Sequence, residues 1–201
     1  MPRFSSVSSA TTYFSSLLLA VTLVASIHAA DAPRVRPVEW AQPVIGSTLD
    51  NFSRVSPDVF RSEQPGAADL PDLKALGIRS LVSLREYHPD SAKFEKAGLV
   101  LLQHPSTAGS LTATDLVTAL KLIRDAPKPA LVHCWHGSDR TGAVIAAYRL
   151  VFQQWTKDQA VDELVNGGYG FHEKTFPEIV PLIRSLDVEK LRAEILPGNK
   201  P

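Results

Sequence analysis

Residues 130–155 join a short apolar run to a strongly periodic segment, and together they restrict the folds open to this chain. The run ALVHC (130–134) has the length and composition of a buried parallel strand. From Arg140 to Trp155 the apolar residues recur at helical spacing, at positions 144, 145, 148, 151, 152 and 155. A buried strand that leads through a short loop into a helix is typical of α/β domains.

The same alternation continues on both sides of this unit. Strands are predicted at 59–65, 78–84 and 99–104. Helices are predicted at 70–77, 89–98, 112–127, 156–167, 177–186 and 188–195. The pattern predicts an α/β fold with a mostly parallel central sheet flanked by helices. Ligands bind such sheets beyond the carboxyl ends of the strands, and Cys134 lies at such an end.

The first 29 residues have the pattern of a secretory signal peptide. Arg3 supplies a positive charge, residues 14–27 are largely apolar, and Ala29 and Ala30 are small residues at a plausible cleavage point. The apolar stretch is short for a membrane span, although an uncleaved anchor is the alternative. We therefore expect an exported protein, periplasmic or secreted if its source is bacterial, with no stable membrane span after signal removal.

The rest of the chain divides into three predicted parts. Residues 30–57 read as an extended leader, 58–195 as the folded domain and 196–201 as a tail. Apolar residues make up 44% of the chain, which is enough for a core. Lys+Arg and Asp+Glu number 21 each, so the charge gives no reason to expect a nucleic-acid partner. The sequence leaves the oligomeric state open.

The segment HCWHGSDRTG (133–142) holds the only cysteine and concentrates several reactive residue types. A short loop that leads into a helix turns backbone N–H groups inward and forms an anion-binding cradle. Gly137 permits the backbone angles that such a loop requires. A cysteine at the base of this cradle is favoured as a thiolate. The planar guanidinium of Arg140 can bind two phosphate oxygens at once.

The sequence HCWHGSDRT resembles the His-Cys-x5-Arg-Ser/Thr pattern of the protein tyrosine and dual-specificity phosphatases. VFRSEQP (59–65) and GGYGFHE (167–173) look like segments of a bacterial dual-specificity-like branch. The resemblance covers roughly residues 55–190. It implies a three-layer cysteine-phosphatase fold and a hydrolase that cleaves phosphoric monoesters.

The resemblance also implies a role for each residue of the loop. Cys134 would attack phosphorus and form a phosphocysteine intermediate. His133 would tune the cysteine, and Thr141 would ease departure of the thiolate in the second step. The phosphate would be bound by the residues of the loop, which are Trp135, His136, Gly137, Ser138, Asp139 and Arg140. No metal or cofactor is required, and the partner is a phosphorylated protein or a small phosphorylated molecule.

The general acid of the family is usually an aspartate on a separate loop before the cysteine. The corresponding segment here, HPSTAGSLTATD (104–115), contains no acidic residue before Asp115, which is predicted to cap a helix with Thr112. In the myotubularin lipid phosphatases the aspartate before the loop arginine is thought to supply the acid. Asp139 could do the same here, or it could pair with a basic neighbour and only shape the loop. Asp115 is the second candidate.

Other residues near the motif have open roles. His136 could add positive charge at the rim, and Trp135 could form a wall of the site or pack in the core. Arg61 and Arg85 are candidates for structural pairing, and His172 with Glu173 could position water.

Two alternatives to a phosphatase stay open, and so does one alternative substrate class for a phosphatase with the same mechanism. A metal site on His133, Cys134 and His136 lacks an evident fourth ligand. A non-catalytic phospho-ligand binding module is disfavoured by the intact Cys134 and Arg140, but the empty acid position keeps it open. Within the same mechanism, a phosphoinositide or inositol phosphate is the alternative substrate.

Overall fold

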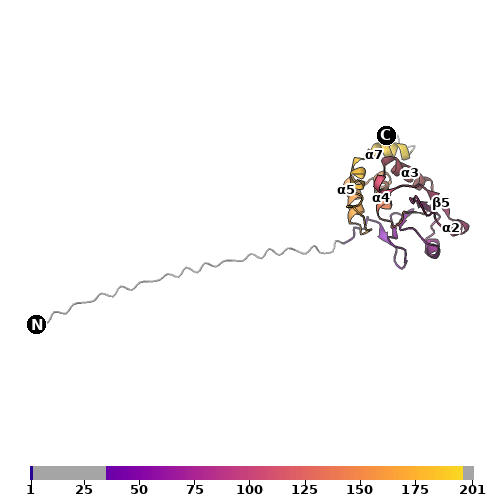
Figure 1. Ribbon diagram of the computed structural model, residues 1–201, viewed down its shortest axis with the longest axis horizontal. Coiled ribbons are helices and arrows are strands. Elements are labelled where there is room, and N and C mark those ends of the chain that lie inside the picture. The colour runs from indigo at the N-terminus through magenta and orange to yellow at the C-terminus, as the bar shows by residue number, and fades with distance from the viewer. Residues whose placement is uncertain (2–34, 197–201) are drawn as a thin grey trace. The chain divides into compact units, whose positions relative to one another are not determined.

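The computed structural model describes Met1 and residues 35–196 (Figure 1). Except for Met1, the predicted signal peptide lies outside the described residues, as does the predicted tail after Leu196. Within the described part of the chain, no helix combines the length and the apolar character that crossing a membrane requires.

A six-stranded sheet forms the centre of the domain. Its strands, in spatial order, are β1 (Gln42–Pro43), β2 (Ser53–Arg54), β3 (Val59–Ser62), β6 (Ala130–His133), β4 (Ser80–Ser83) and β5 (Val100–Gln103). Four neighbouring strands run parallel to one another, namely β3, β6, β4 and β5, whereas β1 and β2 add an antiparallel edge. The strand β6 therefore lies between two parallel neighbours, and the residue that follows it emerges near the middle of the sheet.

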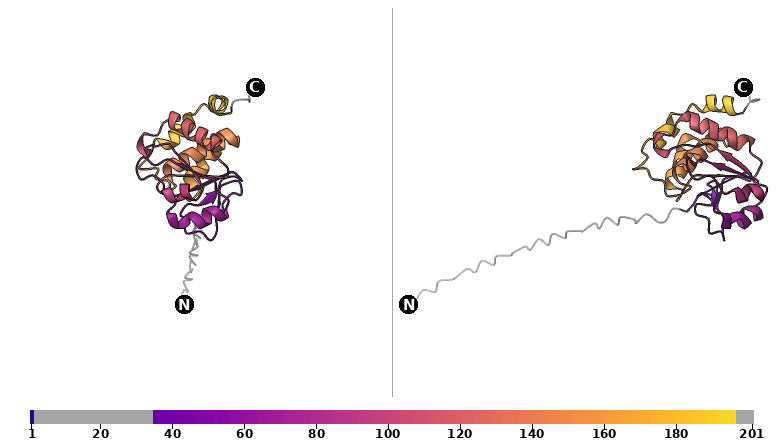
Figure 2. Two further views of the ribbon diagram at one scale, coloured as in Figure 1. Left: turned by 90° about the vertical axis from the view of Figure 1, so that its right-hand side faces the viewer. Right: turned by 45° about the vertical axis from the view of Figure 1, so that its right-hand side comes forward.

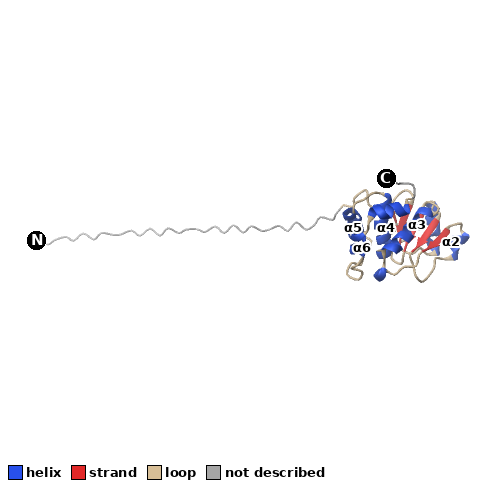
Figure 3. Cartoon of the chain, turned by 90° about the horizontal axis from the view of Figure 1, so that it is seen from above, coloured by secondary structure: helices blue, strands red, loops and turns tan. Residues whose placement is uncertain are grey.

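Helices cover both faces of this sheet (Figure 3). One layer consists of α3 (Ala113–Asp125), α4 (Asp139–Phe152), α5 (Lys157–Asn166), α6 (Ile179–Ser185) and α7 (Val188–Ile195), with α7 in yellow against α3 in Figure 2. The other face carries α1 (Leu70–Ala75) and α2 (Ala92–Lys96). Alternation along β6 explains the layers, because Val132 packs with the α4 cluster and Leu131 packs with Leu73 and Phe94.

The predicted α/β fold is confirmed, and each helix and strand expected from the sequence is present with its ends moved by a few residues. Two short 3-10 helices, Ala67–Asp69 and Ala108–Ser110, and the two-residue strands β1 and β2 were not expected. Segments this short have no hydrophobic period that sequence analysis can detect.

The structure differs from the prediction at the leader, residues 30–57. From Arg36 onward these residues belong to the compact domain. Trp40, Ala41 and Phe52 are buried, and β1 and β2 extend the sheet beside β3. Proline and polar residues in this stretch suggested an extended chain, but its apolar side chains fill the edge of the core.

A buried ion pair joins this segment to the helices. Arg149 donates through Nε and Nη2 to the two carboxylate oxygens of Glu163, each at 2.7 Å, and both side chains are almost fully buried. The backbone N–H of Ala41 donates to Glu163 Oε1 at 2.6 Å. Glu163 therefore links α4, α5 and the chain ahead of β1.

We expect Glu163→Leu to lower the free energy of unfolding by about 3–5 kcal/mol, because it leaves the buried guanidinium of Arg149 without its carboxylate. Urea unfolding of the folded protein measures this change. The matched control is Glu189→Leu, which removes the exposed ion pair with Arg192 and should cost at most about 1 kcal/mol. Equal effects of the two substitutions would contradict a structural role for the buried pair.

Candidate active site

Cys134 lies directly after β6, at the carboxyl end of the parallel strands. Its side chain is buried, and the two neighbouring strands end beside it, since Ser62 of β3 and Ser83 of β4 are both in register with His133. The Leu84 N–H donates to the His133 carbonyl at 2.9 Å, which continues the pairing by one residue. The thiol is therefore fixed in the crevice where α/β sheets bind their ligands.

The loop from Cys134 to Arg140 is held by hydrogen bonds to its carbonyl oxygens. Three donors outside the loop make them: Gln64 N to Trp135 O at 2.9 Å, Asn51 Nδ2 to His136 O at 2.7 Å and Arg61 Nη2 to Gly137 O at 2.6 Å. In a trans peptide unit, the carbonyl and the N–H of the next residue point in opposite directions. The N–H groups of residues 136–138 consequently face the inside of the loop, where they form an anion-binding cradle.

Gly137 is required at the tightest point of this loop. Its φ is +71°, and a Cβ atom there would lie 2.5 Å from the carbonyl carbon and oxygen of Ser62. Only glycine allows the loop to approach the end of β3 so closely.

We expect Gly137→Ala to weaken the binding of inorganic phosphate and to cost more than about 1 kcal/mol of stability, since the added methyl displaces the loop. Gly98→Ala is the control, because Gly98 also has a positive φ, of +91°, but has nothing within 4 Å of its Cβ position. Thermal unfolding and calorimetric phosphate binding of both variants separate the steric clash at Gly137 from the effect of backbone strain alone. A Gly137→Ala variant that binds phosphate as tightly as Gly98→Ala would contradict a tight loop.

Arg61 is a buried cation beneath the loop. Its side chain is 1% exposed, its guanidinium carbon lies 3.5 Å from the centre of the Tyr169 ring, and burial lowers its pKa. The backbone near Tyr169 supports the loop as well, because its carbonyl accepts from Ser138 Oγ at 2.6 Å and from Asn51 Nδ2 at 3.0 Å. Arg61 thus has the structural pairing expected of it, directly against the loop.

Arg140 lies at the far end of the loop, in the first turn of α4. Its Nη1 donates to the carbonyls of Leu84 and Ser106, at 3.1 and 2.9 Å, which lie beyond the ends of β4 and β5. Arg85 stacks on Trp135, with 4.8 Å between the guanidinium carbon and the ring centre, and burial together with the Arg140 charge lowers its pKa. Two positive charges therefore lie on one side of the cysteine.

Two adjoining cavities open at this place and share Trp135 and Arg140. One is lined by Cys134 together with Ala108, Trp135, His136, Asp139, Arg140, His172, Thr175 and Phe176. The other extends past Trp135 between the segments 85–88 and 106–109, and Arg85 and Arg140 both line it. The ring of Trp135 is 59% exposed, so it forms a wall of the site and does not pack in the core.

Asp139 and His172 form a pair at the rim of the first cavity. The carboxylate accepts from the backbone N–H of His172 at 2.9 Å and lies 3.2 and 3.0 Å from its Nδ1. The Asp139 side chain is 11% exposed, whereas that of His172 is 51% exposed. The basic neighbour of Asp139 is thus a residue from a distant segment.

Known proteins resemble this chain in both sequence and overall structure. A sequence model described as the tyrosine phosphatase family matches residues 47–174, which is more than half of the chain. The chain belongs to the tyrosine phosphatase family. The dual specificity protein phosphatase TpbA of Pseudomonas aeruginosa is 33% identical over 190 residues, covering 91% of this chain and 85% of TpbA.

Solved structures agree with this family. The crystal structure of a TpbA cysteine-to-serine variant in complex with phosphotyrosine has a TM-score of 0.73 at 32% identity, and covers 82% of this chain and 100% of that one. The inositol diphosphatase DSP3 of Arabidopsis thaliana is 28% identical over 156 residues, with 73% of this chain and 74% of DSP3 covered. The three-layer phosphatase fold expected from the loop motif is therefore confirmed.

His133, the first residue of the tyrosine phosphatase motif, is completely buried behind the loop. Its Nδ1 lies 3.1 Å from the Cys134 carbonyl oxygen, and its Nε2 lies 2.9 Å from Asp90 Oδ2. Gln64 Nε2 donates to the other Asp90 oxygen at 3.2 Å. This chain of contacts holds the histidine ring and the start of the loop in one position.

Asp115, the second acid candidate, caps a helix. It accepts from the backbone N–H and the hydroxyl of Thr112 and contacts His104. Partial burial alone would raise the pKa of Asp115, but these hydrogen bonds outweigh it and the pKa is lowered. A carboxyl group with a lowered pKa loses its proton at a lower pH than usual, which makes it a poorer proton donor. In addition, Asp115 lines neither cavity at Cys134.

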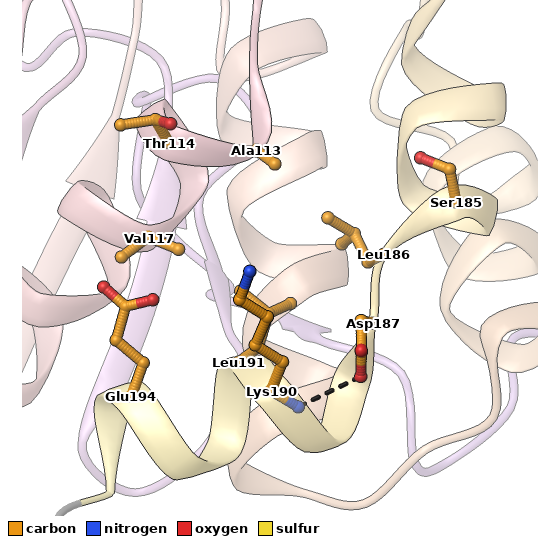
Figure 4. Close-up of a pocket in the computed structure, with 9 residues that line it drawn as sticks. All are labelled: Ala113, Thr114, Val117, Ser185, Leu186, Asp187, Lys190, Leu191 and Glu194. Atoms are coloured by element: carbon orange, nitrogen blue, oxygen red, sulfur yellow. Dashed lines mark hydrogen bonds between the residues drawn. The ribbon is translucent and has the colours of Figure 1, made fainter.

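Two other possible sites in the described chain are a second pocket and a metal site. A separate pocket between the first turn of α3 and helix α7 contains none of the predicted site residues (Figure 4). Among residues 35–196, no group of three or more His, Cys, Asp or Glu side chains converges to hold a metal ion. The rival metal site on His133, Cys134 and His136 therefore has no support in the geometry.

The structure thus gathers at one site every residue of the loop that the sequence singled out, and it adds partners that the sequence did not reveal. Asn51, Gln64 and Asp90 come from segments read as leader, strand end and helix start. A positive φ of 54° at Asn51, which asparagine tolerates better than most residues, is the local reason for an asparagine there.

Proposed function

We propose that this protein hydrolyses phosphoric monoesters through a phosphocysteine formed on Cys134. The observation that carries the proposal is the set of hydrogen bonds that hold the carbonyls of Trp135, His136 and Gly137 toward the outside of the loop. Because of these bonds, the N–H groups of the following residues point inward, around a buried thiol. Such a cradle binds the three non-bridging oxygens of a phosphoryl group and stabilises the charge that they share in the transition state.

In the first step the Cys134 thiolate attacks phosphorus, the bond to the leaving oxygen breaks, and that oxygen takes up a proton. Arg140 binds two of the phosphoryl oxygens with its planar fork. In the second step water attacks the phosphocysteine, and the thiolate leaves. The Thr141 hydroxyl is suited to assist this departure, since it is buried and has no hydrogen-bond partner among the described residues.

The favoured substrate is a phosphotyrosine or another phosphorylated side chain of a protein. The similarity to TpbA, a dual specificity protein phosphatase, supports this class. The exposed rings of Trp135 and Tyr87 beside the cavities offer apolar contact to an aromatic leaving group.

A phosphoinositide or inositol phosphate is the second candidate substrate. The observation that favours it is the second cavity, which Arg85 and Arg140 both line and which adjoins the cavity that contains Cys134. Two guanidinium groups can bind two anionic groups of one substrate. The similarity to an inositol diphosphatase supports this candidate.

The experiment is a substrate panel of phosphopeptides, phosphoinositides and inositol polyphosphates, with Cys134→Ser as the blank. Selective turnover of phosphotyrosine peptides supports the first class, and turnover of the polyanionic small molecules supports the second. Binding of any of them without turnover would instead support a non-catalytic phospho-ligand module.

We also propose that the protein is exported after cleavage near Ala30, so that it acts in the periplasm or outside the cell. The charged, apolar and small-residue order of residues 1–30 supports this. N-terminal sequencing of protein recovered from the periplasm of a bacterial host tests it. Recovery only from the cytoplasm, with Met1 or Pro2 at the N-terminus, would contradict export.

A further inference from the structure

The segment that usually supplies the general acid carries no carboxyl group between His104 and Thr114. A proton must nevertheless reach the leaving oxygen when that oxygen is strongly basic. Three side chains with acid–base groups line the cavity with Cys134: His136, Asp139 and His172.

The carboxylate of Asp139 is occupied by its contacts with His172, so it is poorly placed to donate a proton to the leaving oxygen. Its Oδ1 accepts the backbone N–H of His172, and both carboxylate oxygens face Nδ1. An ionised carboxylate can only accept hydrogen bonds, so the imidazole that pairs with it carries its hydrogen on Nδ1, and Nε2 is the nitrogen that exchanges a proton. Among residues 35–196, Nε2 has no hydrogen-bond partner.

The position of His172 is fixed by more than this carboxylate. Its carbonyl accepts from the N–H groups of Thr175 and Phe176, both at 2.9 Å, and its ring meets the Phe176 ring edge-on at 86°. Its side chain is half exposed and lines the cavity with Cys134, so a leaving group can reach it. His136 lacks such an arrangement, because its ring stacks on Trp135 and no described carboxylate contacts it.

We propose that His172 is a catalytic residue that protonates the leaving oxygen, and that Asp139 is the positioning residue that orients it. The inference rests on the proposed function. As the bond from Cys134 sulfur to phosphorus forms and the bond to the leaving oxygen breaks, the proton on Nε2 of the imidazolium moves to that oxygen. In the second step the neutral imidazole takes a proton from the attacking water, phosphate leaves, and the thiolate and imidazolium are restored.

The test compares two aryl phosphates in the same variants. Phenolate is a strongly basic leaving group and needs a proton, whereas p-nitrophenolate is a weak base and needs little help. For His172→Asn we expect kcat/KM to fall about 10²–10³-fold on phenyl phosphate but only about threefold on p-nitrophenyl phosphate. A merely structural role would lower both by the same factor.

Two further variants complete the design. Asp139→Asn should show the same leaving-group-dependent loss, and the double variant should be no worse than the poorer single variant, because the two residues act as a unit. Lys174→Ala, an exposed change in the same segment, is the control and should leave both rates unchanged.

The outcomes separate this inference from the proposed function. A His172→Asn enzyme that keeps the leaving-group dependence of the unmodified protein overturns the inference, and a selective loss in Asp139→Asn alone assigns the acid to Asp139. Either result leaves the phosphatase function intact. The function itself fails if the unmodified protein turns over neither substrate, or if Cys134→Ser retains turnover.

Discussion

Cys134→Ser is expected to abolish turnover of every phosphomonoester, with a fall in kcat of about 10⁵-fold or more. A serine hydroxyl stays protonated near neutral pH and, unlike a thiolate, does not attack phosphorus without a strong base. The measurement is hydrolysis of p-nitrophenyl phosphate by the full chain, with rapid quenching to trap the phosphocysteine in the unmodified protein.

Binding separates loss of the nucleophile from loss of the site. The cradle is built from backbone N–H groups and Arg140, so the serine variant should still bind inorganic phosphate, as measured by calorimetry. The chain has a single cysteine, so the thiol consumed by an alkylating reagent can be assigned to Cys134. Residual turnover above one per cent, or retained activity after complete alkylation, would refute a cysteine nucleophile.

Arg140→Lys is expected to lower kcat/KM about 10²–10³-fold, the effect of removing one preorganised donor from a transition state. Lysine keeps the positive charge but loses the planar fork. In the unmodified protein, Arg140 Nη1 donates to the carbonyls of both Leu84 and Ser106 while the rest of the guanidinium is left for phosphate. A single ammonium group cannot serve both purposes. The measurement is steady-state kinetics on phosphotyrosine peptides, with phosphate inhibition in parallel.

Arg184→Lys is the matched control, because Arg184 forms an exposed ion pair with Asp158. That variant should retain the activity of the unmodified protein within about twofold, since exposed pairs contribute little. If Arg140→Lys were equally active, charge alone would explain the contribution of Arg140, and the bidentate geometry would be wrong.

The architecture was predictable because its signals are local. The apolar run before Cys134 and the helical period after Arg140 each lie within one continuous segment, and capping residues such as Thr112 and Thr156 mark helix starts. The nucleophile and the phosphate-binding arginine lie in the same ten residues. They could therefore be named before any tertiary contact was known.

The supporting partners were not predictable because they depend on tertiary contacts between distant segments. Asn51 meets the loop across 85 positions of sequence, and Asp90 meets His133 across 43. His172 was considered only for positioning water, since a histidine in a loop shows no sign of a carboxylate partner 33 positions away. The leader was misread for the same reason, because Ala41 is held by Glu163 and Tyr169, which lie much later in the chain.

The outward hydrogen bonds of the loop carbonyls have a consequence for how far the motif can be transplanted. Their donors lie on Asn51, Arg61 and Gln64, outside the strand, loop and helix that carry HCWHGSDRTG. A graft of these ten residues onto another strand–loop–helix scaffold would keep the thiol and the arginine but lose the donors that orient the peptide units. The activity is thus encoded in two separate parts of the chain, and a designed enzyme would have to import both.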